Sequence, residues 1–175
     1  MLRAFKGVDW TAYLTRLEQL YLSTSIEPGH WYPMEVFERM GVAILREIAR
    51  NDLTLVKHFG RVSLNALCKQ YDNLVVPGDP KGSLLRFKVL RQDFFNFPAL
   101  DFEDLFEDEA VAIVSYGMGA VAEEAATYQT MGFFERLLER AGGEPARVSL
   151  SGRSWAGDPK TRVYMRWKIP PGNIG

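Results

Sequence analysis

The chain has 175 residues, of which 47% are hydrophobic and 13% aromatic, and this composition predicts one ordinary globular domain with a sizeable core. The net charge of -1 excludes a strong attraction of the whole protein to nucleic acid or to an anionic membrane. No apolar run approaches the roughly 20 residues that span a bilayer, and residues 1–7 lead into no apolar signal core.

The first helix is expected over 9–22, where large apolar residues recur at helical spacing and Asp9 can cap the start. A polar loop, 23–29, separates it from a histidine and two aromatic residues at 30–32. These three residues stand directly before Pro33. Because proline suits the first turn of a helix, the stretch predicts the start of a second helix.

The second helix is expected over 33–50, and a third follows it, with Asn51 or Asp52 as its cap. A turn-rich connector covers 72–82. The segment 83–95 fits a helix or a strand almost equally, and we favour a helix. The buried stripe of the second helix is expected to comprise Phe37, Met40, Gly41, Ile44, Leu45 and Ile48.

In the second half of the chain the apolar period changes from about 3.6 to about 2, which indicates strands. Two antiparallel strands are expected within 100–114, joined by an acidic turn. Two more are expected over 146–153 and 161–169, because apolar and polar residues alternate there. A long helix at about 122–141 stands between the two pairs and ends at two glycines.

These elements predict an α+β fold in which a helical layer packs on a small antiparallel sheet of about four strands. The sequence contains no internal repeat and no low-complexity tract. We therefore expect residues 1–169 to form a single globular domain and residues 170–175 to form a flexible tail.

The segment 111–122 is the best candidate for a chemical motif, because a strand is followed by a G-x-G-x-x-A pattern and a helix. In dinucleotide-binding folds such glycines bring the pyrophosphate to a helix N-terminus. Here no repeated βαβ units follow, and the acidic residue expected about 20 positions later would lie on a helix, near Glu139. We therefore interpret Gly117 and Gly119 as a strand-to-helix junction.

The remaining candidate groups are isolated in the sequence. His58 could ligate a haem iron, but only Arg61 lies near it as a partner for the propionates, so we interpret it as a surface residue. His30 is interpreted as a loop residue beside Trp31. The single cysteine, Cys68, excludes an internal disulfide and a cysteine-built zinc site, and it favours a reducing, cytoplasmic location. We expect no metal, no cofactor and no catalytic residue.

Two oppositely charged sets lie on the predicted strands. The acidic set on the first strand pair comprises Asp101, Glu103, Asp104, Glu107, Asp108 and Glu109. The basic set on the second pair comprises Arg147, Arg153, Lys160, Arg162, Arg166 and Lys168. The acidic set lacks a calcium-loop pattern, and the overall charge argues against nucleic acid as a partner of the basic set. We expect the two sets to attract each other across the sheet or across a dimer.

Four stretches carry a resemblance to known proteins: MLRAFKG at 1–7, WYP at 31–33, GFFERLLERAGG at 132–143 and YMRW at 164–167. With this order of elements, the chain resembles a paralogous family of uncharacterised proteins expanded in myxobacteria. That family is similar to vinyl-4-reductase-like domains, haem–nitric-oxide-binding domains and vesicle-tethering TRAPP subunits. The resemblance covers most of residues 1–168. It implies an α+β fold with a helical layer on a small antiparallel sheet, frequent dimerisation and, in several members, a hydrophobic pocket.

The sequence departs from this group in two respects. The haem-binding branch is marked by a Tyr-x-Ser-x-Arg motif for the propionates, whereas residues 164–168 read YMRWK. The vinyl-4-reductase-like branch often has cysteines near its last strands, and here those strands contain none. Neither haem nor a cysteine-bound metal is therefore carried over, and no functional residue transfers.

We predict a non-catalytic cytoplasmic sensor or scaffold module that acts as a homodimer and whose ligand, if it has one, is a hydrophobic small molecule between the helices and the sheet. The candidate lining residues, which also suit a packed core, are Phe59, Phe87, Phe94, Phe133 and Trp167. One alternative is a pure protein-interaction module, whose surface would comprise Trp10, Tyr13, Tyr21, Trp31 and Tyr32. A second alternative is a haem or gas sensor that uses His58.

Overall fold

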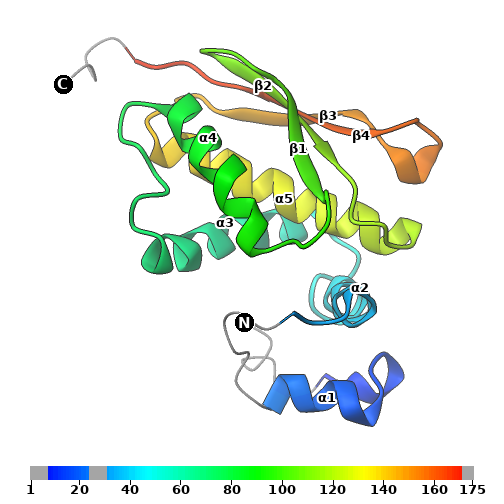
Figure 1. The fold of residues 1–175 in the computed structure, drawn as a ribbon. Coiled ribbons are helices and arrows are strands. Elements are labelled where there is room, and N and C mark those ends of the chain that lie inside the picture. Colours follow the sequence, from blue (N-terminus) through cyan, green and yellow to red (C-terminus); the bar gives the residue numbers. More distant parts are fainter. Residues whose placement is uncertain (1–7, 24–30, 171–175) are drawn as a thin grey trace.

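The computed structural model describes residues 8–23 and 31–170. The predictions for residues 1–7, for the loop up to residue 29, for His30 and for the tail beyond residue 170 lie outside these residues. Within them the chain has an α+β fold, as predicted, with helices on one face of an antiparallel sheet (Figure 1). The helices are α1 (Arg16–Ser23), α2 (Met34–Ala43), α3 (Leu53–Gln70), α4 (Pro80–Leu90) and α5 (Ala120–Arg140). None of these has the length and apolar character needed to cross a membrane.

The sheet has the strand order β1-β2-β4-β3, with all neighbours antiparallel. Its strands are β1 (Leu100–Leu105), β2 (Glu109–Val114), β3 (Arg147–Gly152) and β4 (Thr161–Arg166). Alternate residues of the central strands, such as Ala112 and Val163, are buried because they face the helices. The expected pairing of two hairpins into one sheet is thereby confirmed.

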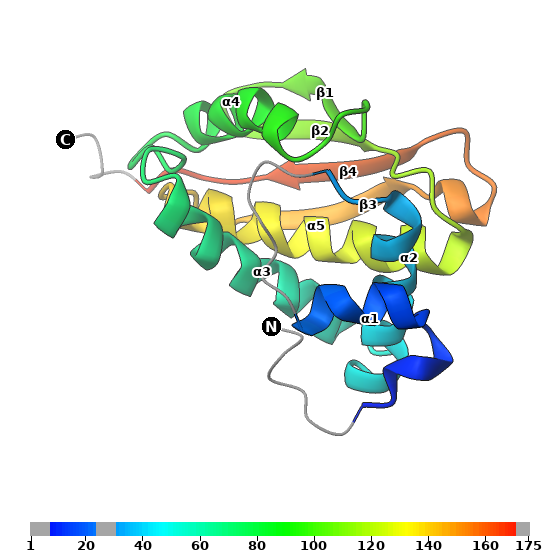
Figure 2. The ribbon, with the colours of Figure 1, turned by 60° about the horizontal axis from the view of Figure 1, so that its bottom comes forward.

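The helices form two layers beneath the sheet. In Figure 1, α5 lies against the sheet and α3 lies beyond it, and Figure 2 shows α3 and α5 running side by side. α4 covers the sheet at β1. The main core between these elements includes Leu64, Leu84, Phe134 and Trp167, which are all almost completely buried. The favoured helix for 83–95 is confirmed by α4, and a 3-10 turn follows over Arg91–Asp93.

The prediction of one helix over 9–22 is wrong. A 3-10 turn covers Trp10–Ala12, where the Asp9 side chain accepts a hydrogen bond from the Thr11 amide, and α1 begins only after Thr15. Thr15 and Glu18 form a capping box: the Thr15 amide donates to the Glu18 carboxylate at 2.8 Å, and the Glu18 amide donates to Thr15 Oγ1 at 3.3 Å. This reciprocal cap starts a new helix in the middle of a continuous apolar stripe.

The second predicted helix is present, but its buried face is shifted. α2 starts after Pro33 and continues as a π-helical turn over Ile44–Ile48. Val36, Met40 and Ala43 are buried, whereas Phe37, expected in the stripe, is 49% exposed. The shift arises because α2 packs on Leu14 with one face and leaves the face carrying Phe37 towards the cavity described below. The third helix is capped by Asp52, as expected, which accepts from the Thr54 amide at 2.8 Å.

The charged sets meet on the open face of the sheet. Glu103 of β1 pairs with Arg162 of β4 at 2.9 Å, with Lys160 further away at 3.9 Å. The Arg162 guanidinium holds the pKa of the Glu103 carboxyl below its ordinary value through a hydrogen bond and its charge. The predicted attraction across the sheet is therefore present within one chain, although such exposed pairs stabilise a fold only slightly.

Candidate binding pocket

Two glycines allow the backbones of α3 and α5 to touch. A Cβ atom on Gly60 would lie 1.8 Å from the carbonyl oxygen of Gln129, and a Cβ atom on Gly132 would lie 1.8 Å from the carbonyl oxygen of Lys57. Any side chain at either position would therefore force the helices apart. The crossing fixes the distance between the two helices that form the back of the cavity.

An ion-pair network holds the same crossing from its solvent side. The Arg61 guanidinium lies 2.7 Å from carboxylate oxygens of both Glu135 and Glu139, and Lys57 Nζ lies 2.7 Å from Glu135. These groups are only partly exposed, so their attraction is screened less than that of a fully exposed pair. The network therefore stabilises one relative orientation of α3 and α5.

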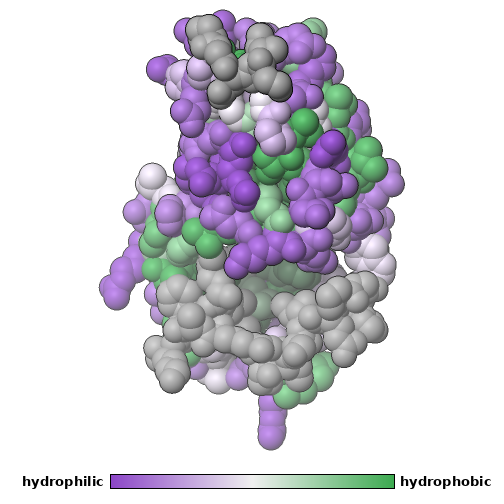
Figure 3. Space-filling model, turned by 90° about the vertical axis from the view of Figure 1, so that its left-hand side faces the viewer, coloured by the Kyte–Doolittle hydropathy of each residue, from purple (hydrophilic) through white to green (hydrophobic). Residues whose placement is uncertain are grey.

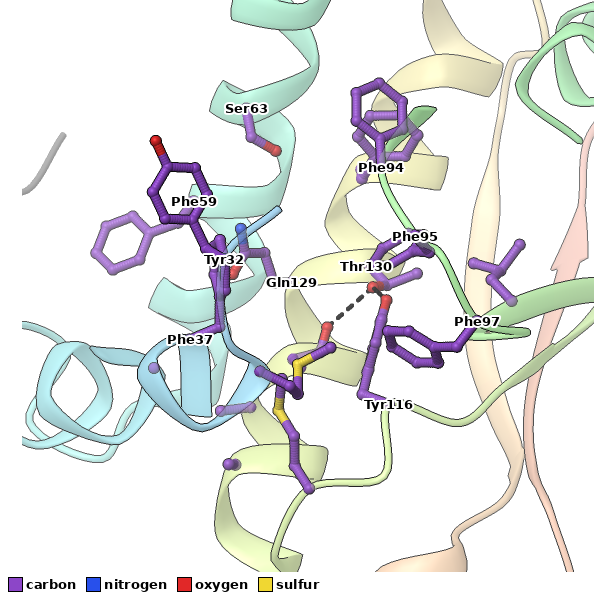
Figure 4. A pocket seen from close by; sticks show the side chains of 18 of the residues that line it. Tyr32, Phe37, Phe59, Ser63, Phe94, Phe95, Phe97, Tyr116, Gln129 and Thr130 are labelled. Atoms are coloured by element: carbon purple, nitrogen blue, oxygen red, sulfur yellow. Dashed lines mark hydrogen bonds between the residues drawn. The ribbon is translucent and has the colours of Figure 1, made fainter. Parts of the chain in front are cut away.

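A cavity of about 610 Å³ opens between α2, α3, α5, the loop after α4 and the junction that follows β2. Figure 4 shows Phe59 and Ser63 of α3 on one side of it, Phe94 to Phe97 on the other, and Thr130 of α5 between them. Its volume lies in the range of small-molecule sites, which is roughly 300–1,000 Å³. The space is therefore large enough to hold a ligand, and it is larger than the small voids that ordinary core packing leaves.

Aromatic rings form a large part of its wall. The rings of Phe95 and Phe97 lie 5.8 Å apart, and Phe95 lies 5.8 Å from the ring of Tyr116. Deeper in the molecule, Phe87 and Phe133 lie 4.8 Å apart. These distances are those of favourable aromatic contacts, so the rings of each group stabilise one another.

The cavity reaches the surface near the start of α2. Trp31 and Phe37 line it and are 57% and 49% exposed. Tyr32 also lines it and packs edge-on against Tyr21 of α1, with ring centroids 5.3 Å apart. On one side of the molecule, Figure 3 shows a recess with hydrophobic residues beneath a band of hydrophilic ones.

One pair of hydroxyl groups lies in this apolar surrounding. Tyr116 Oη is 2.5 Å from Thr130 Oγ1, and Thr130 Oγ1 donates to the carbonyl oxygen of Ala126 at 2.9 Å (Figure 4). Burial raises the pKa of Tyr116 to about 12, with the Thr130 hydrogen bond acting against it and the nearby Glu123 charge adding to it. The phenol therefore keeps its proton at neutral pH.

The G-x-G-x-x-A segment forms the junction beside this pair. Gly117 has a φ of 71°, which favours glycine, and α5 begins after Gly119. The buried Glu123 carboxylate accepts from the amides of Tyr116 at 2.8 Å and Met118 at 3.0 Å. A carboxylate of the chain itself therefore occupies the N-terminus of α5. Because the sheet is antiparallel, the interpretation of this segment as a strand-to-helix junction is confirmed.

The described lining residues do not fit a haem. They include no histidine, cysteine, lysine or arginine, and the charged one among them, Asp93, is acidic. A haem needs an axial ligand, usually a histidine or a thiolate, and cations near its propionates. Tyrosine and methionine side chains line the cavity, but the described lining has no cation for the propionates, and His58 is exposed and lies outside it. In residues 8–23 and 31–170, no three His, Cys, Asp or Glu side chains are grouped to hold a metal ion.

The structure brings together four of the five residues expected to line a pocket: Phe59, Phe87, Phe94 and Phe133. Trp167 lies elsewhere. It is 1% exposed and is part of the core beneath the sheet, where its Cβ faces Gly143 at the end of α5. The alternation along β4 indicates burial for Trp167, but it does not distinguish the core from the cavity.

The residues expected on an interaction surface divide into two groups. Trp31 and Tyr32 line the cavity, while Trp10, Tyr13 and Tyr21 pack around the small cluster of Leu14, Val36 and Met40. Sequence reasoning missed Tyr116 and Thr130. Their only signal is that a tyrosine follows a buried strand directly and that a threonine lies on the inward face of a long helix.

Comparison of the structure with solved structures finds H-NOX domains. A Cs H-NOX mutant matches with a TM-score of 0.63, 12% identity, and coverage of 97% of this chain and 92% of that chain. An H-NOX protein from S. oneidensis in the Fe(II)NO ligation state matches with a TM-score of 0.62, 9% identity, and coverage of 90% and 85%.

An H-NOX mutant from T. Tengcongensis matches with a TM-score of 0.59, 13% identity, and coverage of 95% of this chain and 100% of that chain. No protein-family model and no curated protein matches the chain. The likeness to haem–nitric-oxide-binding domains is therefore confirmed at the level of fold, and the resemblance to a myxobacterial family stays a prediction.

Proposed function

We propose that the protein is a non-catalytic, cytoplasmic sensor or scaffold module that binds a hydrophobic small molecule and acts as a homodimer. The observation that carries this proposal is the cavity of about 610 Å³ with an aromatic wall. The fold supports it by analogy, because structural neighbours are H-NOX domains described in Fe(II)NO and Fe(II)CO ligation states. We expect the ligand of this chain to be a hydrophobic organic molecule other than haem, since the described lining has no histidine, no thiolate and no cation for the propionates.

The position of the cavity supports a sensing role. The cluster of Leu14, Val36 and Met40 between α1 and α2 is separate from the main core. The cavity lies between this cluster and the core, with Tyr32 and Phe37 on one side and Phe59 and Phe133 on the other. A bound ligand joins the two clusters and restrains α1 and α2, whereas the empty protein leaves them less restrained.

Native mass spectrometry of freshly purified protein tests both parts of the proposal. We expect a dimer whose mass exceeds that of two chains, and we expect the excess to disappear when the protein is denatured. The released compound is then identified by its own mass. A monomer would contradict the homodimer, and a protein that carries no excess mass and takes up no hydrophobic dye would contradict the binding function.

A protein-interaction module is the second candidate, and one observation favours it. Leu17 on the outer side of α1 is 70% exposed, although it belongs to the apolar stripe of that helix. Large exposed apolar groups often mark partner sites. For this function we expect a clean dimer mass without extra species, and we expect Leu17→Asp to weaken the dimer. A dimer that Leu17→Asp leaves intact excludes α1 as its interface.

A further inference from the structure

Resting on the proposed function, we infer that the cavity selects uncharged hydrophobic ligands that carry a hydrogen-bond donor, such as a hydroxyl group, and discriminates against carboxylates. The inference depends on the direction of one hydrogen-bond chain in the cavity wall and on the sign of the charges around it.

The direction of the chain follows from counting protons. A threonine hydroxyl has one proton, and Thr130 Oγ1 donates it to the carbonyl oxygen of Ala126 at 2.9 Å. Thr130 must therefore accept in its contact of 2.5 Å with Tyr116, and the phenol proton of Tyr116 is the one donated. Tyr116 Oη is left with unused lone pairs and with no proton to offer. A ligand can satisfy these lone pairs only with a donor of its own.

The charges near this pair have the opposite sign from those that an anionic ligand needs. The Glu123 carboxylate accepts from the Tyr116 amide at 2.8 Å, so a negative charge lies directly behind the tyrosine. Asp93 adds an acidic group at the rim, and the lining, as far as the structure describes it, contains no lysine or arginine. A buried carboxylate without a cationic partner is strongly disfavoured, so fatty acids and other anions bind more weakly than uncharged ligands of the same length.

The rest of the wall is mostly hydrophobic, with Tyr32, Ser63, Asn96 and Gln129 among its other polar side chains. Phe59, Phe94, Phe95 and Phe133 are among the aromatic residues that line the cavity. A polar contact at Tyr116 fixes the orientation of a ligand rather than supplying most of its affinity. The expected ligand therefore places one donor group against Tyr116 and its apolar part towards the opening near Trp31.

Three ligands of equal chain length separate the contribution of the hydrogen bond from that of the charge: 1-decanol, methyl decanoate and decanoate. Each displaces the neutral dye Nile red from the full-length protein at pH 7.5, and its affinity is taken from the loss of fluorescence. We expect 1-decanol to bind about fivefold more tightly than methyl decanoate, which corresponds to one neutral hydrogen bond. We expect decanoate to bind at least about tenfold more weakly than 1-decanol, because its charge is buried without a partner.

Two variants of the pair give different expected results. Tyr116→Phe removes the acceptor, so the preference for alcohol over ester should fall from about fivefold to about one. Thr130→Val removes the acceptor of the tyrosine proton, which then becomes available to a ligand. We expect this variant to bind methyl decanoate about fivefold more tightly than the wild type does, and we expect no such gain in Tyr116→Phe.

Each result supports or overturns the inference. Equal affinities for alcohol and ester in the wild type, or a preference that Tyr116→Phe leaves unchanged, overturn it while dye uptake still supports the proposed function. Tighter binding of decanoate than of 1-decanol also overturns it. A wild-type protein that binds neither dye nor any of the three ligands overturns the proposed function itself. Because the alcohol-to-ester ratio is compared within one folded variant, a general loss of affinity does not imitate the loss of preference expected for Tyr116→Phe, and it cannot produce the gain expected for Thr130→Val.

Discussion

Gly60 of α3 and Gly132 of α5 lie where the backbones of the two helices touch, and each occupies a place in which a Cβ atom would meet a carbonyl oxygen of the other helix. The two residues belong to the element pair with the most extensive contact in the molecule. The crossing holds the side chains on either side of it, Phe59 and Phe133, at the edge of the cavity.

Substitution of either glycine tests this role. Gly60→Ala or Gly132→Ala should lower the free energy of unfolding by about 3 kcal/mol, because the helices must separate to admit the methyl group. Gly41→Ala on α2 is the matched control, since nothing lies within 4 Å of its expected Cβ atom. It should raise stability by roughly 0.8 kcal/mol through helix propensity. Urea denaturation measures all three, and equal effects at positions 41 and 60 would contradict the crossing.

The junction before α5 depends on Glu123. Glu123→Ala should lower the free energy of unfolding by about 3 kcal/mol, because it leaves the amides of Tyr116 and Met118 without their acceptor. Its neighbour Glu124 is more exposed, so Glu124→Ala should change stability by no more than about 0.5 kcal/mol. Thermal unfolding followed by circular dichroism compares the two variants. A Glu123→Ala protein as stable as the wild type would show that this carboxylate does not hold the junction.

The ion pairs beside the crossing make part of the stability dependent on pH. Burial raises the pKa of the Glu139 carboxyl, but hydrogen bonds and charge from Arg61 and Arg136 outweigh it, so this pKa lies below the ordinary value of 4.5. The ionised form therefore stabilises the fold above pH 4.5, and this contribution is lost as the pH falls through the lowered pKa. Glu139→Gln should be less stable than the wild type at pH 6.5, and the difference should shrink at pH 3. A difference that is constant between these two pH values would contradict the ion pair.

Haem addition tests the difference between this chain and its structural neighbours. After incubation with haem and gel filtration, we expect no Soret band in the protein fraction, because the described lining offers no histidine, thiolate or cation. His58 is exposed and lies outside the cavity, so His58→Ala should give the same spectrum as the wild type. A Soret band that disappears in His58→Ala would restore the haem-sensor alternative.

The strands and the long helix α5 could be predicted from the sequence because their periodicity is strong. Residues 161–166 alternate between buried and more exposed side chains, as their pattern indicates, and α5 ends before its two glycines. The break at Thr15 was not predicted, because an apolar stripe continues through a position where a capping box starts a new helix. Apolar periodicity identifies the buried face of a helix, but the position of the helix ends depends on hydrogen bonds made by single side chains.

The sequence predicts four of the lining residues, but it does not show that they enclose a space, because the cavity is set by the geometry of a crossing rather than by a pattern along the chain. A phenylalanine that lines a void and one that fills a core have the same periodicity: Phe133 lines the cavity, while its neighbour Phe134 is fully buried in the core. The glycines inside α3 and α5 were the available signal, since glycine is unfavourable in a helix unless close packing requires it. Which side of the crossing stays hollow follows only from the positions of α2 and the loop after α4.

The central claim is that the cavity holds a ligand, and Nile red uptake by a cavity-filling variant tests it most directly. Ser63 of α3 lines the cavity, whereas Ala66, one turn later, is exposed and lies outside the lining. We expect the wild type and Ala66→Trp to bind the dye at one site per chain with similar affinity, and we expect Ser63→Trp to lose binding by at least about tenfold because the indole ring occupies the space. Equal dye binding by Ser63→Trp and Ala66→Trp, with both variants folded, would contradict the claim.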